Sequence, residues 1–211
     1  MNIIVNLARP RTYAELGVYR GCSLLAALTA ANNAKLALRA WGIDTWAGDE
    51  HSGSYVGDGF YQEVLAKTSE LNSDTHLLRM TFDEAQPKID DGTIDLLHID
   101  GLHTYEAVKH DFENWLPKLS DAGIVILHDT AEFKDDFGVY RLWDEVRGRY
   151  PNLAFTHSHG LGVLFVGETR TPDVQRLIDA WDDDLFRGMF STVCRYAGEL
   201  NRITQGSEIV A

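Results

Sequence analysis

Short apolar runs alternate along this chain of 211 residues with longer segments whose apolar positions recur at helical spacing. The short runs have the length of strands. One of them contains Ile124–Leu127, which has no polar residue, as is typical of a strand buried on both faces of a parallel sheet. The segments predicted to be strands are Thr12–Leu16, Leu36–Ile43, His76–Met80, Ile94–Ile99, Gly123–Leu127, Leu153–Thr156 and Leu161–Val166.

The longer segments are predicted to be helices. In Tyr105–Leu119 the apolar residues Val108, Phe112 and Trp115 repeat with a period near 3.6, and Pro151 ends another such segment. Alternating strands and helices predict a doubly wound α/β fold with a mostly parallel sheet and helices on both faces, to which the last hairpin adds an antiparallel edge strand. The predicted helices are Cys22–Ala31, Phe60–Leu71, Tyr105–Leu119, Val139–Tyr150 and the region from Asp173 onward.

The last part of the chain differs from the rest because its pattern is helical throughout. We expect a main domain over residues 1–170 and a helical appendage over residues 171–211. A stripe of apolar residues in the appendage predicts a helix that packs on the main domain, forms a contact in a homodimer or serves as a lid. This stripe consists of Leu185, Met189, Val193, Tyr196 and Leu200.

The charge of the chain narrows the set of partners. Lysine and arginine number 19 against 32 aspartates and glutamates, and the net charge of −13 argues against nucleic acid and anionic membrane surfaces. No apolar run approaches the roughly 20 residues of a membrane span, and the first residues do not read as a secretory leader. With two cysteines, Cys22 and Cys194, no disulfide framework is expected, and the cytoplasm is the simplest compartment.

Candidate chemistry begins at the turn after the first predicted strand. Glu15, Gly17 and Gly21 precede Ser23 there, and the glycines allow a ligand to approach the backbone beside the unpaired N–H groups of a helix start. The two glycines are four residues apart and do not match the G-x-G-x-x-G fingerprint of dinucleotide-binding folds. A carboxylate at Glu15 would repel a pyrophosphate but attract an ammonium group.

Two further predicted strands end in histidines and acids. Ligands of open parallel sheets bind beyond the carboxyl ends of the strands, so residues at these ends are expected to converge with Glu15. By strand alternation His98 points the same way as Asp100, and we expect it to be a buried, hydrogen-bonded histidine. The residues expected to converge are Asp100, His103, His128 and Asp129.

Taken together, these motifs resemble those of class I S-adenosylmethionine-dependent methyltransferases, and in particular a bacterial branch whose members stand beside, or are fused to, glycosyltransferases. The resemblance runs from about Leu7 to Gly167 and does not cover the C-terminal helices. Ala122 departs from the pattern, because the family usually has glycine before the fifth strand. The matching segments are His98–Val108, Trp115–Leu119, Ile124–Thr130, Asp44–Trp46, Gly48–His51, Arg79–Ala85 and His159–Val163.

The resemblance implies an enzyme with a seven-stranded Rossmann-like sheet and S-adenosylmethionine as its cofactor. Glu15 would lie near the amino group of the cofactor, Asp44 would hydrogen-bond the ribose hydroxyls, and the stretch containing Phe82 would flank the adenine. The residues implied to bind the cofactor are Glu15, Gly17, Gly21, Ser23, Asp44, Thr81, Phe82 and Asp100.

More distant relatives, which methylate catechols and macrolide sugars, supply a template for catalysis. By this likeness Asp100, His128 and Asp129 would hold a divalent metal ion, Mg²⁺ or Mn²⁺, and His103 would be the general base beside Asp100. His128 replaces a carboxylate of the template, and a mixed set suits Mn²⁺, Fe²⁺ or Zn²⁺ better than Mg²⁺, which prefers oxygen ligands. The alternative has no metal, and Asp129 is then a strand-end acid that bonds backbone and substrate.

The resemblance further implies O-methylation of a sugar hydroxyl on a glycan or glycoconjugate, in association with a glycosyltransferase. The alternatives are N-, O- or C-methylation of another small molecule and a non-catalytic partner domain of a glycosyltransferase. A nucleotide-dependent oxidoreductase is less well supported by the glycine spacing. The loop Asp49–Gly59, which contains His51 and Tyr55, is expected to fold over the cofactor or the acceptor.

Overall fold

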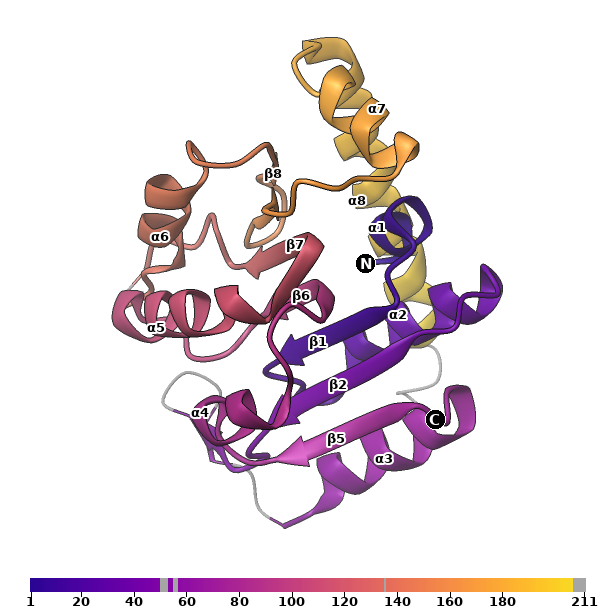
Figure 1. The fold of residues 1–211 in the computed structure, drawn as a ribbon, viewed down its shortest axis with the longest axis vertical. Helices are drawn as coiled ribbons and strands as arrows, with labels where there is room; N and C mark the ends of the chain where they lie inside the picture. Colours follow the sequence, from indigo (N-terminus) through magenta and orange to yellow (C-terminus); the bar gives the residue numbers. More distant parts are fainter. Residues whose placement is uncertain (50–52, 55–56, 135, 207–211) are drawn as a thin grey trace.

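The centre of the molecule is a seven-stranded sheet (Figure 1). The computed structural model describes residues 1–49, 53–54, 57–134 and 136–206, so the predicted roles of His51 and Tyr55 lie outside the described residues. In spatial order the strands are β5 (Thr75–Arg79), β2 (Arg39–Asp44), β1 (Thr12–Leu16), β6 (Ile94–Ile99), β7 (Leu119–His128), β9 (Leu161–Phe165) and β8 (Asn152–Phe155).

The five strands from β5 to β7 are parallel, and β9 is antiparallel to both of its neighbours. This confirms the predicted doubly wound, mostly parallel fold, with one difference in detail. The antiparallel strand is β9, which inserts between β7 and β8, whereas the edge strand is β8. The burial pattern explains the order: β9 is buried on both faces over most of its length, whereas buried and half-buried residues alternate in β8.

Helices cover both faces of the sheet (Figure 1). The sheet therefore lies between two apolar clusters, one on each face. Ile124 and Ile126 of β7 point into the first cluster, and Val125 and Leu127 point into the second, as the period of a strand requires. The helices of the first face are α1 (Asn2–Ala8), α2 (Cys22–Asn33), α3 (Gly59–Leu71), α7 (Pro172–Ala180) and α8 (Asp184–Gly206). Those of the second face are α4 (Phe82–Ala85), α5 (Tyr105–Trp115) and α6 (Val139–Val146).

Several boundaries differ from the predicted ones. α5 ends at Trp115 because Pro117 lies in the short 3₁₀ helix η2 (Leu116–Lys118), and β7 therefore starts at Leu119, earlier than predicted. Another 3₁₀ helix, η1 (Gln86–Lys88), follows α4. The glycine-rich loop after β2 contains a short hairpin, β3 (Gly48–Asp49) with β4 (Gly53–Ser54), which its composition did not indicate.

The C-terminal helices pack on the first face through aromatic side chains. Trp181 contacts both Phe155 of β8 and Phe190 of α8, with ring centroids 5.4 and 5.8 Å apart. Four members of the predicted apolar stripe, Leu185, Met189, Val193 and Tyr196, are exposed on α8. Among the described residues, no helix combines the length and the apolar composition that a membrane span requires.

Candidate functional site

A cavity of about 580 Å³ opens at the carboxyl ends of the central strands β1, β2 and β6. This is the position at which open α/β sheets bind ligands. Seven of the residues predicted from the sequence line this cavity: Gly17, Ser23, Asp44, Thr81, Phe82, Asp100 and His103.

The glycine turn after β1 is held against the end of β6. Gly17 has a φ of +89°, and a Cβ built on it would lie 2.0 Å from the carbonyl oxygen of Asp100, so only glycine fits. The amide of Gly17 donates to the carbonyl of Ile43 at 2.9 Å, and the amide of Asp100 donates to the carbonyl of Leu16 at 2.8 Å. Gly21, also at positive φ, caps the start of α2. These contacts fix the wall of the cavity in the backbone itself.

Asp44 ties this turn to the end of β2. Its Oδ2 accepts from the amides of Val18 and Tyr19 at 2.9 and 2.8 Å, and its Oδ1 accepts from the amide of Trp46 at 2.7 Å. The carboxylate thus caps the end of β2 and holds the glycine turn through backbone amides. A carboxylate has about four lone-pair sites, so one remains for a ligand. The ribose contact of Asp44 stays a prediction.

Glu15 lies behind the cavity and does not belong to its lining. It is fully buried, and the hydroxyls of Tyr13 and Ser23 both donate to its carboxylate. Burial, and then the charge of Glu15, raise the pKa of the Tyr13 phenol well above its ordinary value. Because Ser23 does line the cavity, its hydroxyl lies between the carboxylate of Glu15 and the cavity.

Thr81 and Phe82 form the opposite wall. The Thr81 side chain accepts from the amide of Glu84 and the Glu84 side chain accepts from the amide of Thr81, a capping box that starts α4. This cap leaves the Phe82 ring against Gly101, where a Cβ would come within 2.5 Å of Phe82 Cε2. The wall beside Gly101 is therefore an aromatic ring edge.

Four of the predicted residues converge beside the cavity, and two of them, Asp100 and His103, belong to its lining. Nε2 of His103 lies 3.3 Å from Oδ1 of Asp100 and 3.3 Å from Oδ2 of Asp129. Nδ1 of His128 lies 2.7 Å from Oδ1 of Asp129 and 3.5 Å from Oδ1 of Asp100. We call these four residues the His–Asp cluster. They meet because β6 and β7 are neighbours in register, so that their two ends stand side by side.

A buried histidine connects the cluster with Glu15. His98 is 3% exposed, its Nδ1 lies 3.9 Å from Oε2 of Glu15, and its ring centroid is 6.3 Å from that of His128. The predicted burial of His98 is confirmed. The predicted hydrogen bond is not found at Nδ1, which has no hydrogen-bond partner among the described residues. Glu15 therefore does not contact the cluster directly but is connected with it through His98.

Electrostatics favours the charged forms of two cluster members. Burial opposes ionisation of Asp100, but the hydrogen bond with His103 and the neighbouring histidines outweigh it and lower the pKa of Asp100. Burial likewise opposes protonation of His128, yet the carboxylates of Asp129, Asp100 and Glu15 outweigh it and raise the pKa of His128. The cluster is thus a cation-favouring group beside the cavity.

The donor atoms of the cluster fit a divalent ion. Ligand atoms of Asp100, His103 and His128 lie within 4.8 Å of one another, with the Asp129 carboxylate beside them. Two imidazoles and two carboxylates suit Mn²⁺, Fe²⁺ or Zn²⁺ better than Mg²⁺. In this geometry His103 takes part in a ligand set from which the sequence-based interpretation had left it out. Because Nε2 of His103 has one lone pair, it cannot bind a metal ion and accept a proton at the same time.

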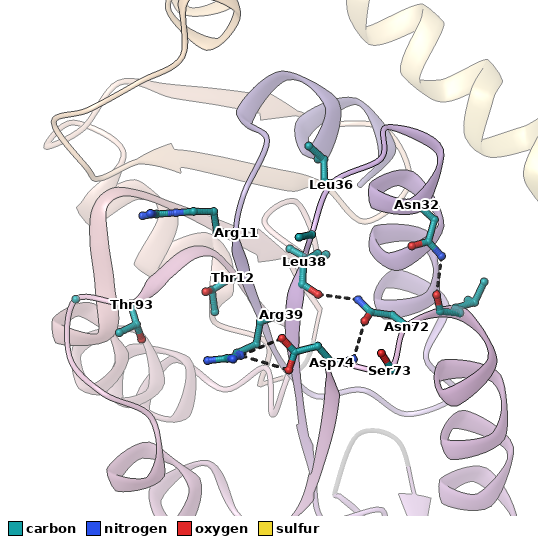
Figure 2. A pocket seen from close by; sticks show the side chains of 13 residues that line it. Arg11, Thr12, Asn32, Leu36, Leu38, Arg39, Asn72, Ser73, Asp74 and Thr93 are labelled. Carbon is teal, nitrogen blue, oxygen red and sulfur yellow. Dashed lines mark hydrogen bonds and ion pairs between the residues drawn. The ribbon is translucent and has the colours of Figure 1, made fainter.

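A second, larger hollow of about 780 Å³ lies at the other end of the sheet (Figure 2). Several of its polar side chains bond within the protein: Arg39 pairs with Asp74 at 3.2 Å, and the amide group of Asn72 donates to the carbonyl of Leu38 at 2.7 Å. Asn32 donates to the carbonyl of Leu71 at 2.7 Å. These groups close the turns between α2, β2, α3 and β5, so the hollow has a structural explanation.

The contacts of two aromatic residues at the site were not predicted, although Trp46 belongs to a segment that matches the family. Trp46 is buried at positive φ, and its indole nitrogen donates to the carbonyl of Tyr19 at 2.9 Å, which fastens the loop after β2 to the glycine turn. The ring of Phe137 stacks on the imidazole of His103, with centroids 5.0 Å apart. Both belong to loops, where the hydrophobic pattern gives no sign of such contacts.

Comparisons with known proteins agree with this architecture. Residues 14–130 match the model of a family described as "Methyltransferase domain". A curated relative, the uncharacterized protein y4gI of Sinorhizobium fredii, is 44% identical over 165 residues, which cover 78% of this chain. The chain spans only 18% of the length of that relative.

Solved structures of low sequence identity share the fold. One is the O-methyltransferase TomG of Streptomyces achromogenes, solved in complex with SAM, at 16% identity and a TM-score of 0.58, with 79% of this chain and 77% of that chain covered. Another is the SAH-bound methyltransferase PaMTH1 of Podospora anserina, at 13% identity and a TM-score of 0.56, with 78% and 74% covered. The chain therefore belongs to the methyltransferase domain family, which confirms the predicted class, a class I S-adenosylmethionine-dependent methyltransferase.

Proposed function

We propose that this chain transfers the methyl group of S-adenosylmethionine to a sugar hydroxyl of a glycan or glycoconjugate, with His103 as the general base. The observation that carries the catalytic part is the position of His103. Its Nε2 lies between two carboxylates, 3.3 Å from each, and its side chain borders the cavity of the glycine turn. The sugar as acceptor, and an association with a glycosyltransferase, rest on the resemblance of the sequence motifs.

The charge of the cavity lining supports binding of the cofactor. S-adenosylmethionine carries a cationic sulfonium and an ammonium group, and the lining carries Asp44 and Asp100 with the charge of Glu15 behind Ser23. Phe82 offers an aromatic surface for the adenine. The fold shared with TomG, which was solved with SAM, supports the same placement.

The reaction needs alignment and a proton acceptor. A lone pair of the acceptor oxygen forms a bond to the methyl carbon while the carbon–sulfur bond breaks, and the sulfonium becomes the neutral thioether of S-adenosylhomocysteine. The hydroxyl proton passes to Nε2 of His103 in the tautomer protonated at Nδ1, in which Nε2 no longer donates to Asp100. Asp100 and Asp129 then stabilise the imidazolium that forms. Alignment of the reacting atoms contributes roughly 7–11 kcal/mol.

A divalent metal ion is the second part of the proposal. Asp100, His128 and Asp129 would hold it, which leaves His103 as the base. When bound, such an ion lowers the pKa of a hydroxyl group and orients it. The donor set supports Mn²⁺ as the first ion to test.

The proposal is tested by transfer of radiolabelled methyl groups from S-adenosylmethionine to a panel of glycans and small hydroxylated molecules. Each acceptor is tested after exhaustive chelation and again with Mn²⁺ or Mg²⁺. We expect label on sugar hydroxyls. Label on amines or carbon atoms alone would refute the O-methylation, and label on other hydroxylated molecules but not on glycans would refute the sugar assignment. Full activity after chelation would refute the proposed role of a metal ion.

A further inference from the structure

The segment that follows β7 folds back over the segment that follows β6. Thr104 and Phe137 form an isolated antiparallel bridge, and the amide of Gly138 donates to the carbonyl of His103 at 2.8 Å. A Cβ on Gly138 would lie 2.4 Å from the amide nitrogen of Tyr105, so the two segments are in close backbone contact. His103 and Phe137 are thereby fixed next to each other.

The rings of these two residues are parallel. The planes of the Phe137 and His103 rings differ by 2°, with centroids 5.0 Å apart, and the His103 side chain is 19% exposed. A ring stacked on one face of the imidazole restricts its rotation about the Cβ–Cγ bond. The orientation kept in this way is the one in which Nε2 faces both Asp100 and Asp129.

Phe137 is itself supported from the hairpin of β8 and β9. The ammonium group of Lys134 lies 5.4 Å from the centroid of the Phe137 ring and 3.6 Å from Glu132. Glu132 contacts Nδ1 of His159 at 2.7 Å, and the carbonyl of His159 accepts from the amide of Ala131 at 2.8 Å. A continuous series of contacts thus runs from the hairpin turn to the imidazole of His103.

We propose that Phe137 is a positioning residue, which holds the His103 imidazole with Nε2 toward Asp100 and Asp129. For its effect on catalysis this inference rests on the proposed role of His103 as the base. For the orientation of the ring it rests only on the contacts described above. Phe137 itself touches His103 and takes no part in the transfer of the methyl group or the proton.

The test compares Phe137→Leu with Phe137→Tyr, which keeps the ring. The probe is the NMR resonance of the imidazole Hε1 of His103, assigned by its absence in His103→Asn and recorded without cofactor or metal. The neighbouring ring shields this proton, so we expect its resonance to shift in Phe137→Leu and to stay near the wild-type position in Phe137→Tyr. Phe133→Leu is the matched control, because Phe133 is an exposed ring of the same loop and contacts Tyr140.

Kinetics supply the second arm. With an acceptor from the panel above, kcat of Phe137→Leu is expected to fall about tenfold to a hundredfold, the size of effect caused by a small misplacement of a reacting group. The KM for S-adenosylmethionine should change less than twofold, and Phe137→Tyr should restore kcat. If Phe137→Leu fails to fold by circular dichroism, Phe137→Met, which is similar in volume but has no ring, replaces it in both arms.

Two results would overturn the proposal: a His103 resonance that is the same in wild type and in the ringless variants, or a kcat that they leave unchanged. Failure of the proposed function is recognised separately. If the wild type methylates no hydroxyl group, the O-methylation is refuted, while the NMR arm still decides whether the Phe137 ring lies against the imidazole of His103.

Discussion

The carbonyl oxygen of Asp100 lies only 2.0 Å from the point where Gly17 would carry a Cβ. The glycine turn that forms one wall of the cavity and the strand end that carries Asp100 are therefore packed backbone to backbone. Any side chain at residue 17 must push these two segments apart, which changes the cavity and the position of Asp100 together.

Gly17→Ala is expected to abolish binding of S-adenosylhomocysteine and to destabilise the protein by several kcal/mol. The clash with Asp100 adds to the cost of a left-handed backbone, which is about 1–2 kcal/mol for a residue other than glycine. Calorimetric titration with S-adenosylhomocysteine and urea unfolding measure the two effects.

Gly92→Ala is the matched control for this substitution. Gly92 also has a positive φ, +72°, but no atom lies within 4 Å of the Cβ that would be added. We expect a loss of about 1–2 kcal/mol in stability and no change in cofactor affinity. Equal effects of the two substitutions would show that the contact with Asp100 has no importance of its own.

Asp44→Ala is expected to weaken S-adenosylhomocysteine binding at least about tenfold, or about 1.4 kcal/mol. The substitution removes the acceptor of three backbone amides that shape the glycine turn, and charged hydrogen bonds contribute about 1.5–3 kcal/mol each. Asp74→Ala is the control, since this carboxylate bonds side chains at the far end of the sheet. An affinity that is the same in both variants would contradict the role given to Asp44.

Asp111 makes the stability of the protein depend on pH. Burial raises the pKa of this carboxyl from its ordinary value of 3.8 to about 7. Between about pH 4 and pH 7 the native protein therefore holds a proton that the unfolded chain has lost, so stability falls as pH rises through this range.

Asp111→Asn should remove this dependence. Compared with the wild type, the variant should therefore gain up to about 4 kcal/mol more stability at pH 8 than at pH 4, at 1.36 kcal/mol for each pKa unit. Urea unfolding at several pH values measures the difference, and the exposed Asp90 supplies the control variant Asp90→Asn. Parallel stability curves for wild type and Asp111→Asn would exclude a raised pKa.

Mn²⁺ binding without cofactor tests the His–Asp cluster as a metal site. We expect His128→Ala to lower the affinity for Mn²⁺ at least about tenfold, because one of few donor groups is lost. His110→Ala should have no effect, since His110 is an exposed residue of α5 that pairs with Asp83. Calorimetry or paramagnetic relaxation measures the binding, and an unchanged affinity in His128→Ala would argue against this ligand set.

Much of the fold could be predicted because its signals are local. β6 and α5 show the apolar run and the helical period from which they were predicted. The order of β8 and β9 could not be predicted, because it depends on which strand of a hairpin pairs with β7. α1 has only two buried residues, Ile4 and Val5, too few for a recognisable pattern.

The sequence predicted which residues belong to the candidate site better than it predicted the contacts between them. Strand ends that lie side by side bring Asp100 and His128 together, and this follows from the fold alone. The contacts depend on loop conformations that the sequence pattern does not specify. Asp129, for example, adopts a φ of +58°, and Phe137 reaches His103 only because its loop folds back.

The central claim is that His103 takes the proton of the acceptor hydroxyl at this cavity. The most direct measurement is the rate of methyl transfer to a sugar hydroxyl by His103→Asn at saturating S-adenosylmethionine, with His110→Asn as control. We predict that kcat falls by about 10²–10⁴ in His103→Asn, while the affinity for S-adenosylhomocysteine and the rate of the control stay unchanged. A kcat of His103→Asn within a factor of three of the wild type would contradict this role of His103.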